Sequence, residues 1–205
     1  MKSPKKRRAI YQDVIDSPPY KVAEIINGEL HLSSRPGGPA TVVASKLGQK
    51  LGPPFERGGD GRGGWLILWE PELHLGDQIV VPDLAGWRFE RLPMAPDGAF
   101  FTIPPDWICE VLSRSTEKLD REDKMPIYAS AGVEYAWLVH PRRRTLEAFR
   151  LHDGRWLTMA VHKDDARARI EPFDAIELDL ALLWADAALP TRAGEEPAHY
   201  SPGGT

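Results

Sequence analysis

Two apolar runs that each carry one carboxylate constrain the fold of this chain more than any other feature. Residues 79–84 contain Asp83, and residues 107–112 contain Glu110. Runs rich in Val, Ile and Trp predict buried strands. A carboxylate among buried residues is costly unless it is paired, hydrogen-bonded or bound to a metal. Two of them on neighbouring strands therefore predict a small acidic site, which a hard cation such as magnesium would stabilise.

Each polar residue near these runs also has an ordinary structural interpretation. Asp83 could accept backbone hydrogen bonds at a strand end, and Glu110 could pair with an arginine. A polar helix after the second run places Asp120, Lys124 and Tyr128 on one face. Lys124 could lie over the carboxylates and stabilise charge on a phosphate, or form with Asp120 a surface ion pair worth about 0.3 kcal/mol. The spacing alone leaves both interpretations open.

Composition limits the class of protein. The 205 residues fit one domain, which we expect over 10–188, with a basic arm over 1–9 and a disordered tail over 189–205. The net charge of −4 argues against broad electrostatic binding of DNA without excluding a local basic face. The single Cys109 excludes an internal disulfide and predicts a small buried hydrophobe. No stretch has the about 18 apolar residues of a membrane span, so we expect a cytoplasmic protein.

Periodicity and turn signals predict the remaining elements. They are a hairpin over 20–32 that turns at Asn27-Gly28, an amphipathic helix over 40–51 that Gly52-Pro53-Pro54 ends, a strand over 65–75, a buried strand over 134–140, an edge hairpin over 145–162 that turns at Asp153-Gly154, and a helix over 179–188. Pro126 should kink the polar helix. Glu70 and Glu72 are expected to face solvent, although one of them could approach the acidic site. In the Gly-rich stretch 56–64, Arg57 and Arg62 are candidates for contact with nucleic acid phosphates.

An ordered set of motifs resembles a known family. The set is Pro82-Asp83, Glu110-Val111-Leu112-Ser113, Asp120, Lys124, Tyr128, the run 132–139, and the opening hairpin with Asn27-Gly28-Glu29-Leu30. Over about residues 12–186 the chain resembles the Uma-type family of bacterial restriction endonucleases, a branch of the PD-(D/E)XK nuclease superfamily. The resemblance implies a mixed α/β fold with a restriction-endonuclease-like core, in which helices flank a central mixed β-sheet.

The resemblance also implies roles for individual residues. Asp83 and Glu110 would bind Mg²⁺ or Mn²⁺, with the backbone carbonyl of Val111 as a further ligand. An acidic residue of the opening segment, Glu24 or Glu29, would complete the site.

One position departs from the superfamily pattern. The superfamily lysine belongs two residues after the glutamate, where this chain has Leu112. Lys124 from the following helix could serve the same space. The resemblance then implies a metal-dependent endonuclease that hydrolyses DNA, and a homodimer would suit paired cuts. The alternatives are a catalytically inactive module of the same fold that binds DNA or a protein partner, and a structural dimerisation domain, which would leave the acidic pair unexplained.

Overall fold

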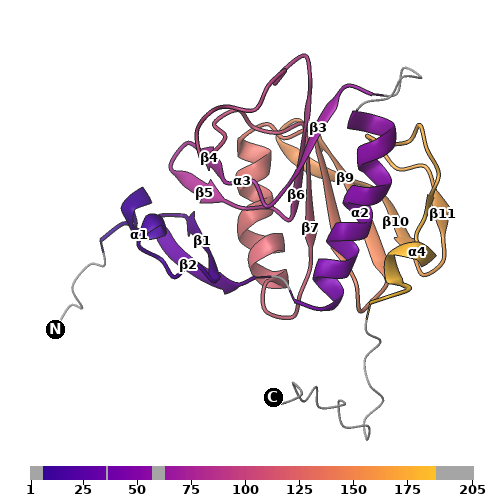
Figure 1. Ribbon diagram of the computed structural model, residues 1–205, viewed down its shortest axis with the longest axis horizontal. Helices are drawn as coiled ribbons and strands as arrows, with labels where there is room; N and C mark the ends of the chain where they lie inside the picture. The colour runs from indigo at the N-terminus through magenta and orange to yellow at the C-terminus, as the bar shows by residue number, and fades with distance from the viewer. Residues whose placement is uncertain (1–6, 36, 57–62, 188–205) are drawn as a thin grey trace, which may run out of the picture.

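The protein folds as a mixed α/β structure around one large sheet (Figure 1). The computed structural model describes residues 7–35, 37–56 and 63–187. Most of the predicted basic arm and the whole of the predicted tail therefore lie outside the described residues. The predicted fold class, a central mixed sheet flanked by helices, is confirmed.

The large sheet has six strands in the order β10-β9-β8-β7-β6-β3. These are β3 (Trp65–Trp69), β6 (Leu84–Arg88), β7 (Trp107–Val111), β8 (Tyr135–His140), β9 (Thr145–His152) and β10 (Arg155–Lys163). Only β7 and β8 pair in parallel, joined by a helical crossover, and the other neighbours are antiparallel. The edge hairpin β9–β10 turns at Asp153 and Gly154, both with positive φ, as the sequence predicted.

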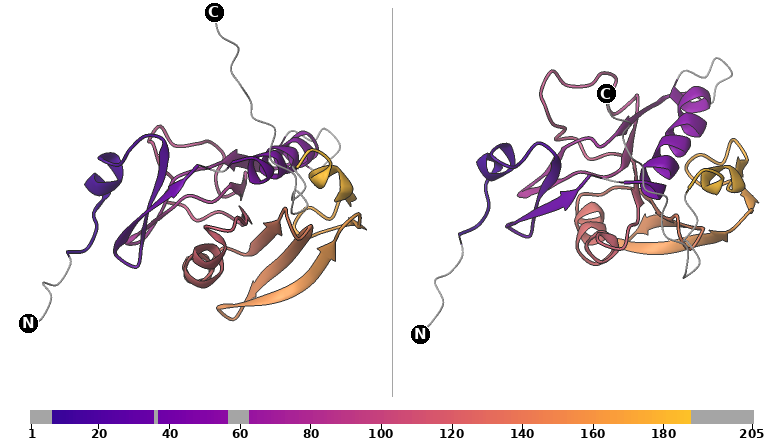
Figure 2. Two further views of the ribbon diagram at one scale, coloured as in Figure 1. Left: turned by 90° about the horizontal axis from the view of Figure 1, so that it is seen from below. Right: turned by 60° about the horizontal axis from the view of Figure 1, so that its bottom comes forward.

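Helices cover both faces of this sheet (Figure 2). On one face α2 (Pro39–Glu56) and α4 (Ala181–Trp184) pack with alternate strand residues, such as Trp107 and Cys109. On the other face, a π-helical segment η1 (Leu119–Lys124) continues into α3 (Met125–Ser130) over Ile108 and Leu112. Glu110 shares the parity of Ile108 and Leu112, so its side chain points towards the η1–α3 helix. Cys109 is fully buried, as predicted.

A smaller sheet brings the N-terminal hairpin to the large one. Its order is β2-β1-β5-β4, with β1 (Lys21–Ile26), β2 (Glu29–Ser34), β4 (Leu73–Leu75) and β5 (Gln78–Val80). Asn27 and Gly28 adopt φ of 54° and 83°, so the predicted hairpin turn is confirmed. The short helix α1 (Tyr11–Ile15) precedes this sheet, and β11 (Arg167–Ala168) pairs with β12 (Leu178–Asp179) near α4. Figure 1 shows α1, β1 and β2 projecting from the body of the large sheet.

Two predicted strands were wrong in their bounds. The strand predicted over 65–75 is divided, because Glu70 has φ +45° and Pro71 follows it, so that β3 and β4 join different sheets. The strand predicted to reach Asp83 ends at Val80 in β5, since Pro82 has no N–H for the ladder. The strand β6, which begins directly after Asp83, was missed.

The predicted helix ends also differ from the structure. Helix α2 continues through Gly52-Pro53-Pro54 to Glu56, where buried Phe55 packs against Phe173 with ring centroids 4.8 Å apart. Tertiary packing therefore outweighs the local helix-ending signal. Pro126 lies directly after η1 inside the continuous η1–α3 helix, where its missing N–H leaves a carbonyl of the preceding turn without its intrahelical bond. The C-terminal helix covers only Ala181–Trp184 of the predicted 179–188.

Candidate functional site

Asp83 lies at the point where the chain enters the large sheet. Leu84 pairs with Cys109 across β6 and β7, so continuing this antiparallel register places Asp83 opposite Glu110. The backbone N–H of Val111 donates a hydrogen bond of 2.6 Å to Asp83 Oδ2. The backbone contact expected of a strand-end carboxylate is therefore present, and it holds Asp83 beside the second acid.

Glu110 is 2% exposed and is held by two groups from the covering helix. The Tyr128 hydroxyl donates to Glu110 Oε1 at 2.6 Å, and Lys124 Nζ lies 2.9 Å from the same oxygen. The alternative partner, an arginine, is absent from its contacts within the described residues. Glu110 is thus paired with the lysine that the family resemblance singled out.

Lys124 is the centre of the arrangement. Its side chain is 3% exposed, and Nζ lies 2.9 Å from Glu24 Oε1 and 3.7 Å from Asp120 Oδ1. The ammonium group also donates to the Val81 carbonyl at 3.1 Å. The alternative of an exposed Lys124–Asp120 surface pair is therefore wrong, because both side chains are buried.

The π-helical turn explains how one helix presents three polar side chains to the site. The N–H of Met125 bonds to the carbonyl of Asp120, five residues back, so this turn holds one residue more than an α-helical turn. Residues four apart overshoot a full turn in an α-helix but fall short of one in a π-helix. The step from Asp120 to Lys124 falls short of one full helical turn, and the step from Lys124 to Tyr128 exceeds one. The two deviations cancel, so all three side chains lie on the face of the helix that points to Glu110.

The structure separates the two candidate acids of the opening segment. Glu24 is 3% exposed, accepts a hydrogen bond of 2.8 Å from the N–H of Val81, and pairs with Lys124. Glu29 is exposed on β2 and does not line the cavity described below. Arg57 and Arg62 lie outside the described residues.

These groups line one cavity of about 330 Å³. Its walls come from β1–β2, the start of α2, the segment before β6, the end of β7 and the η1 helix, and include Glu24, Ser33, Ser34, Arg35, Glu70, Asp83, Glu110, Val111, Ser113, Ser115, Thr116, Asp120 and Lys124. A second cavity of about 450 Å³, between β5 and α3, contains none of them.

Glu70 is a cavity residue for which solvent exposure was the main prediction. It pairs with Arg35 at 2.7 Å, and its backbone N–H donates to the carbonyl of Asp83 at 3.1 Å. The sequence held one usable signal, because Pro71 directly after Glu70 favours a break in the strand. That break turns Glu70 towards Asp83.

The electrostatics of the cavity follow from several carboxylates that are removed from water with too few positive charges beside them. Burial raises the pKa of Asp83 to about 7, although the hydrogen bond from the Val111 N–H and the charge of Lys124 both lower this pKa. Burial likewise raises the pKa values of Glu110 and Asp120, and Lys124 opposes both shifts. Burial alone would lower the Lys124 pKa, but Glu110 and Glu24 outweigh it and raise that pKa. One ammonium group thus serves several carboxylates, and the cavity favours a further cation.

The donor set fits a small hard cation. Asp83, Glu110 and Val111 all line the cavity and offer two carboxylates and a backbone carbonyl. In the part of the chain that the structure describes, no group of three or more His, Cys, Asp or Glu side chains is arranged so that it could hold a metal ion, which leaves a site of two carboxylates. Magnesium is commonly held by one or two carboxylates, with water and substrate oxygens as the other ligands.

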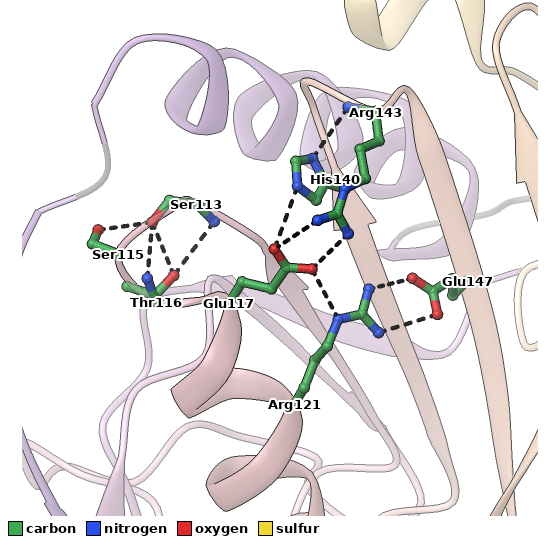
Figure 3. Close-up of polar contacts among 8 residues, drawn as sticks. All are labelled: Ser113, Ser115, Thr116, Glu117, Arg121, His140, Arg143 and Glu147. Atoms are coloured by element: carbon green, nitrogen blue, oxygen red, sulfur yellow. Dashed lines mark hydrogen bonds and ion pairs between the residues drawn. The ribbon is translucent and has the colours of Figure 1, made fainter.

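A second polar cluster anchors the start of the same helix (Figure 3). Glu117 accepts hydrogen bonds from Arg121 Nε at 3.2 Å and from Arg143 Nη1 at 2.8 Å, and Arg121 also pairs with Glu147 of β9. His140 Nε2 lies 3.7 Å from Glu117, and burial together with the charge of Arg143 lowers the His140 pKa. These contacts fix the first helical turn against β8 and β9.

The fold is that of a nuclease-like protein of known structure. The chain is similar to the crystal structure described as a "putative nuclease belonging to DUF820" from Anabaena variabilis ATCC 29413, with a TM-score of 0.65 and 21% identity over 82% of this chain and 92% of that one. Residues 11–182 match the model of the Uma2 family, described as "Putative restriction endonuclease", and the chain belongs to that family. None of the curated proteins matches it. No helix among the described residues is long and apolar enough to cross a membrane.

Proposed function

We propose that the protein is an endonuclease that hydrolyses DNA phosphodiester bonds with Mg²⁺ or Mn²⁺. The observation that carries this proposal is the group of buried Glu24, Glu110 and Asp120 and half-buried Asp83 around Lys124, in a cavity with more carboxylates than cations. Family membership supports a nuclease in general. The metal, the role of the lysine and the DNA substrate are the parts that we propose.

The position of each residue in the cavity suggests its role in the proposed reaction. Asp83, Glu110 and the Val111 carbonyl would hold the cation, which polarises the scissile phosphate and lowers the pKa of an attacking water. Lys124 supplies positive charge where negative charge develops on the phosphate. The Tyr128 hydroxyl orients Glu110, because its hydrogen bond fixes one carboxylate oxygen.

Glu24 acts on the lysine rather than on the substrate. The three N–H donors of Lys124 point to Glu24, Glu110 and the Val81 carbonyl. Since Glu24 is itself fixed by the N–H of Val81, the segment before Asp83 positions the amine. The amine thereby reaches the acidic pair from the helix, although Leu112 occupies the usual position of the superfamily lysine.

Substitution of the acids tests the proposal. Asp83→Asn and Glu110→Gln should each abolish cleavage of DNA in Mn²⁺ while circular dichroism shows an intact fold. Glu29→Gln is the matched control, because this exposed glutamate lies outside the cavity, and its activity should equal that of the wild type. Unchanged cleavage by either cavity variant would refute the assignment.

Calorimetric titration with Mg²⁺ and Mn²⁺ separates the enzyme from an inactive module. Binding that is lost in Asp83→Asn supports the metal site. A wild-type protein that binds neither ion would instead be the non-catalytic module, for which Leu112 in place of lysine is the structural reason. The homodimer stays a prediction, which sedimentation equilibrium would test.

A further inference from the structure

Trp69 is half exposed, whereas four other tryptophans of the large sheet are buried. Trp65, Trp87, Trp107 and Trp137 are at most 3% exposed, whereas Trp69 at the end of β3 is 49% exposed. Exposing an indole forgoes the burial energy that the neighbouring tryptophans gain. A ligand that covers the indole beside the polar cavity would recover this burial energy.

The indole is held in place by the packing of α2. A Cβ on Gly48 would lie 1.9 Å from Trp69 Cζ2, so the ring rests directly against a helix backbone that has no side chain at that point. Gly48 is itself buried. The contact fixes the ring while half of the side chain stays open to solvent, and a fixed flat apolar surface loses little entropy when it binds another ring.

Trp69 lies beside the acidic cavity. A depression of about 250 Å³ is lined by Trp69 and Ala44 together with Arg35, Glu70 and Asp83. The last three residues also line the acidic cavity, so the two hollows share a wall. A ligand that contacts the indole is therefore adjacent to Asp83.

The shape and charge of the cavity decide which nucleic acid suits it. Glu24, Glu110, Asp120 and Lys124 are 2–4% exposed, so a phosphate must enter the cavity to reach them. Duplex DNA is bound mainly through many lysine and arginine contacts to its phosphates. The cations that line the two hollows within the described residues, Lys124 and Arg35, are both paired with carboxylates.

Hydroxyl groups line part of the cavity. Ser33 and Ser34 come from β2, and Ser113, Ser115 and Thr116 come from the loop before the helix, where Figure 3 shows them together. A flexible single strand can turn one phosphate into the cavity at little cost, whereas a duplex must be bent or kinked to do so.

We propose that Trp69 is a stacking platform for one unpaired base of a single-stranded DNA substrate whose neighbouring phosphate enters the acidic cavity. Stacking on an aromatic side chain accepts any base, because every base has a π-face. The inference rests on the proposed action on DNA and names the form of that substrate.

Binding of a fluorescein-labelled 20-nucleotide single strand, and of the same sequence as a duplex, tests the proposal by fluorescence anisotropy in Ca²⁺. The wild type should bind the single strand more tightly than the duplex. Trp69→Ala should weaken single-strand binding roughly tenfold to a hundredfold, whereas Trp69→Phe keeps most of it. Phe89→Ala is the matched control, since Phe89 is an exposed aromatic residue beyond the opposite end of β6 and lines neither hollow. Its affinity should match the wild type.

Equal affinity of Trp69→Ala and the wild type for the single strand would overturn the proposal, and so would equal or tighter binding of the duplex by the wild type. Cleavage assays in Mn²⁺ keep this outcome separate from the proposed function. A protein that binds the single strand through Trp69 but cleaves no DNA retains the platform and loses the nuclease assignment. A protein that cleaves the duplex with Trp69→Ala unimpaired retains the nuclease assignment and loses the platform.

Discussion

Asp83→Asn should stabilise the metal-free protein at alkaline pH, although it removes a carboxylate of the proposed active site. Burial raises the pKa of Asp83 from its ordinary 3.8 to about 7. Between these two values the native state keeps a proton that the unfolded chain releases, so the free energy of unfolding falls as pH rises through this range. Above pH 7 the native protein carries the full cost of a charged Asp83.

The size of this cost follows from the two pKa values. Each tenfold change in a proton equilibrium is 1.36 kcal/mol, so the difference between 3.8 and about 7 corresponds to about 4 kcal/mol. Asp83 is only half-buried, so solvent screens part of its charge, and the expected gain for Asp83→Asn at pH 8.5 is therefore about 2–4 kcal/mol. The asparagine amide oxygen can still accept the hydrogen bond from the N–H of Val111.

Urea unfolding in EDTA at pH 4.5 and pH 8.5 measures the effect. The advantage of Asp83→Asn should be at most about 1 kcal/mol at pH 4.5 and reach its full size at pH 8.5. Saturating Mn²⁺ at pH 8.5 should then stabilise the wild type but not the variant, because only the wild type offers the carboxylate. Asp77→Asn, at an exposed aspartate, is the control and should show neither effect. A variant no more stable than the wild type at pH 8.5 would contradict the reasoning.

Two further substitutions test the supporting structure. Tyr128→Phe removes the 2.6 Å hydrogen bond to buried Glu110, and urea unfolding should show a loss of about 1–3 kcal/mol together with slower DNA cleavage; unchanged stability would mean that the hydroxyl does not hold the acid. Gly48→Ala places a Cβ 1.9 Å from Trp69 Cζ2 and should cost about 1–3 kcal/mol in the same assay. Gly52→Ala in the same helix meets no atom closer than 3.6 Å and should stabilise the protein by about 0.5–1 kcal/mol, so equal effects of the two alanines would argue against the tryptophan contact.

Local signals in the sequence were enough for much of the fold. The two hairpin turns at Asn27-Gly28 and Asp153-Gly154 depend only on residues that accept positive φ. The run over 134–140 became the fully buried β8 because its apolar residues leave no polar face. The same short-range signals failed at two places. At Glu70 the positive φ of the backbone breaks the predicted strand, and at Pro53-Pro54 the packing of Phe55 extends the helix.

The sequence by itself determined that Asp83 and Glu110 had to find partners, because they stand in or beside apolar segments that must be buried, but it left open whether Lys124 is buried or exposed. Only the tertiary structure decided which residues are their partners. Strand register placed Asp83 opposite Glu110, and a π-helical turn aimed Lys124 at both Glu110 and Glu24. Glu24 and Glu29 differ in their surroundings, although both belong to the opening hairpin. The physical reason is that burial forces charges to pair, but the pairing itself depends on contacts between segments up to about 100 residues apart, which no local pattern encodes.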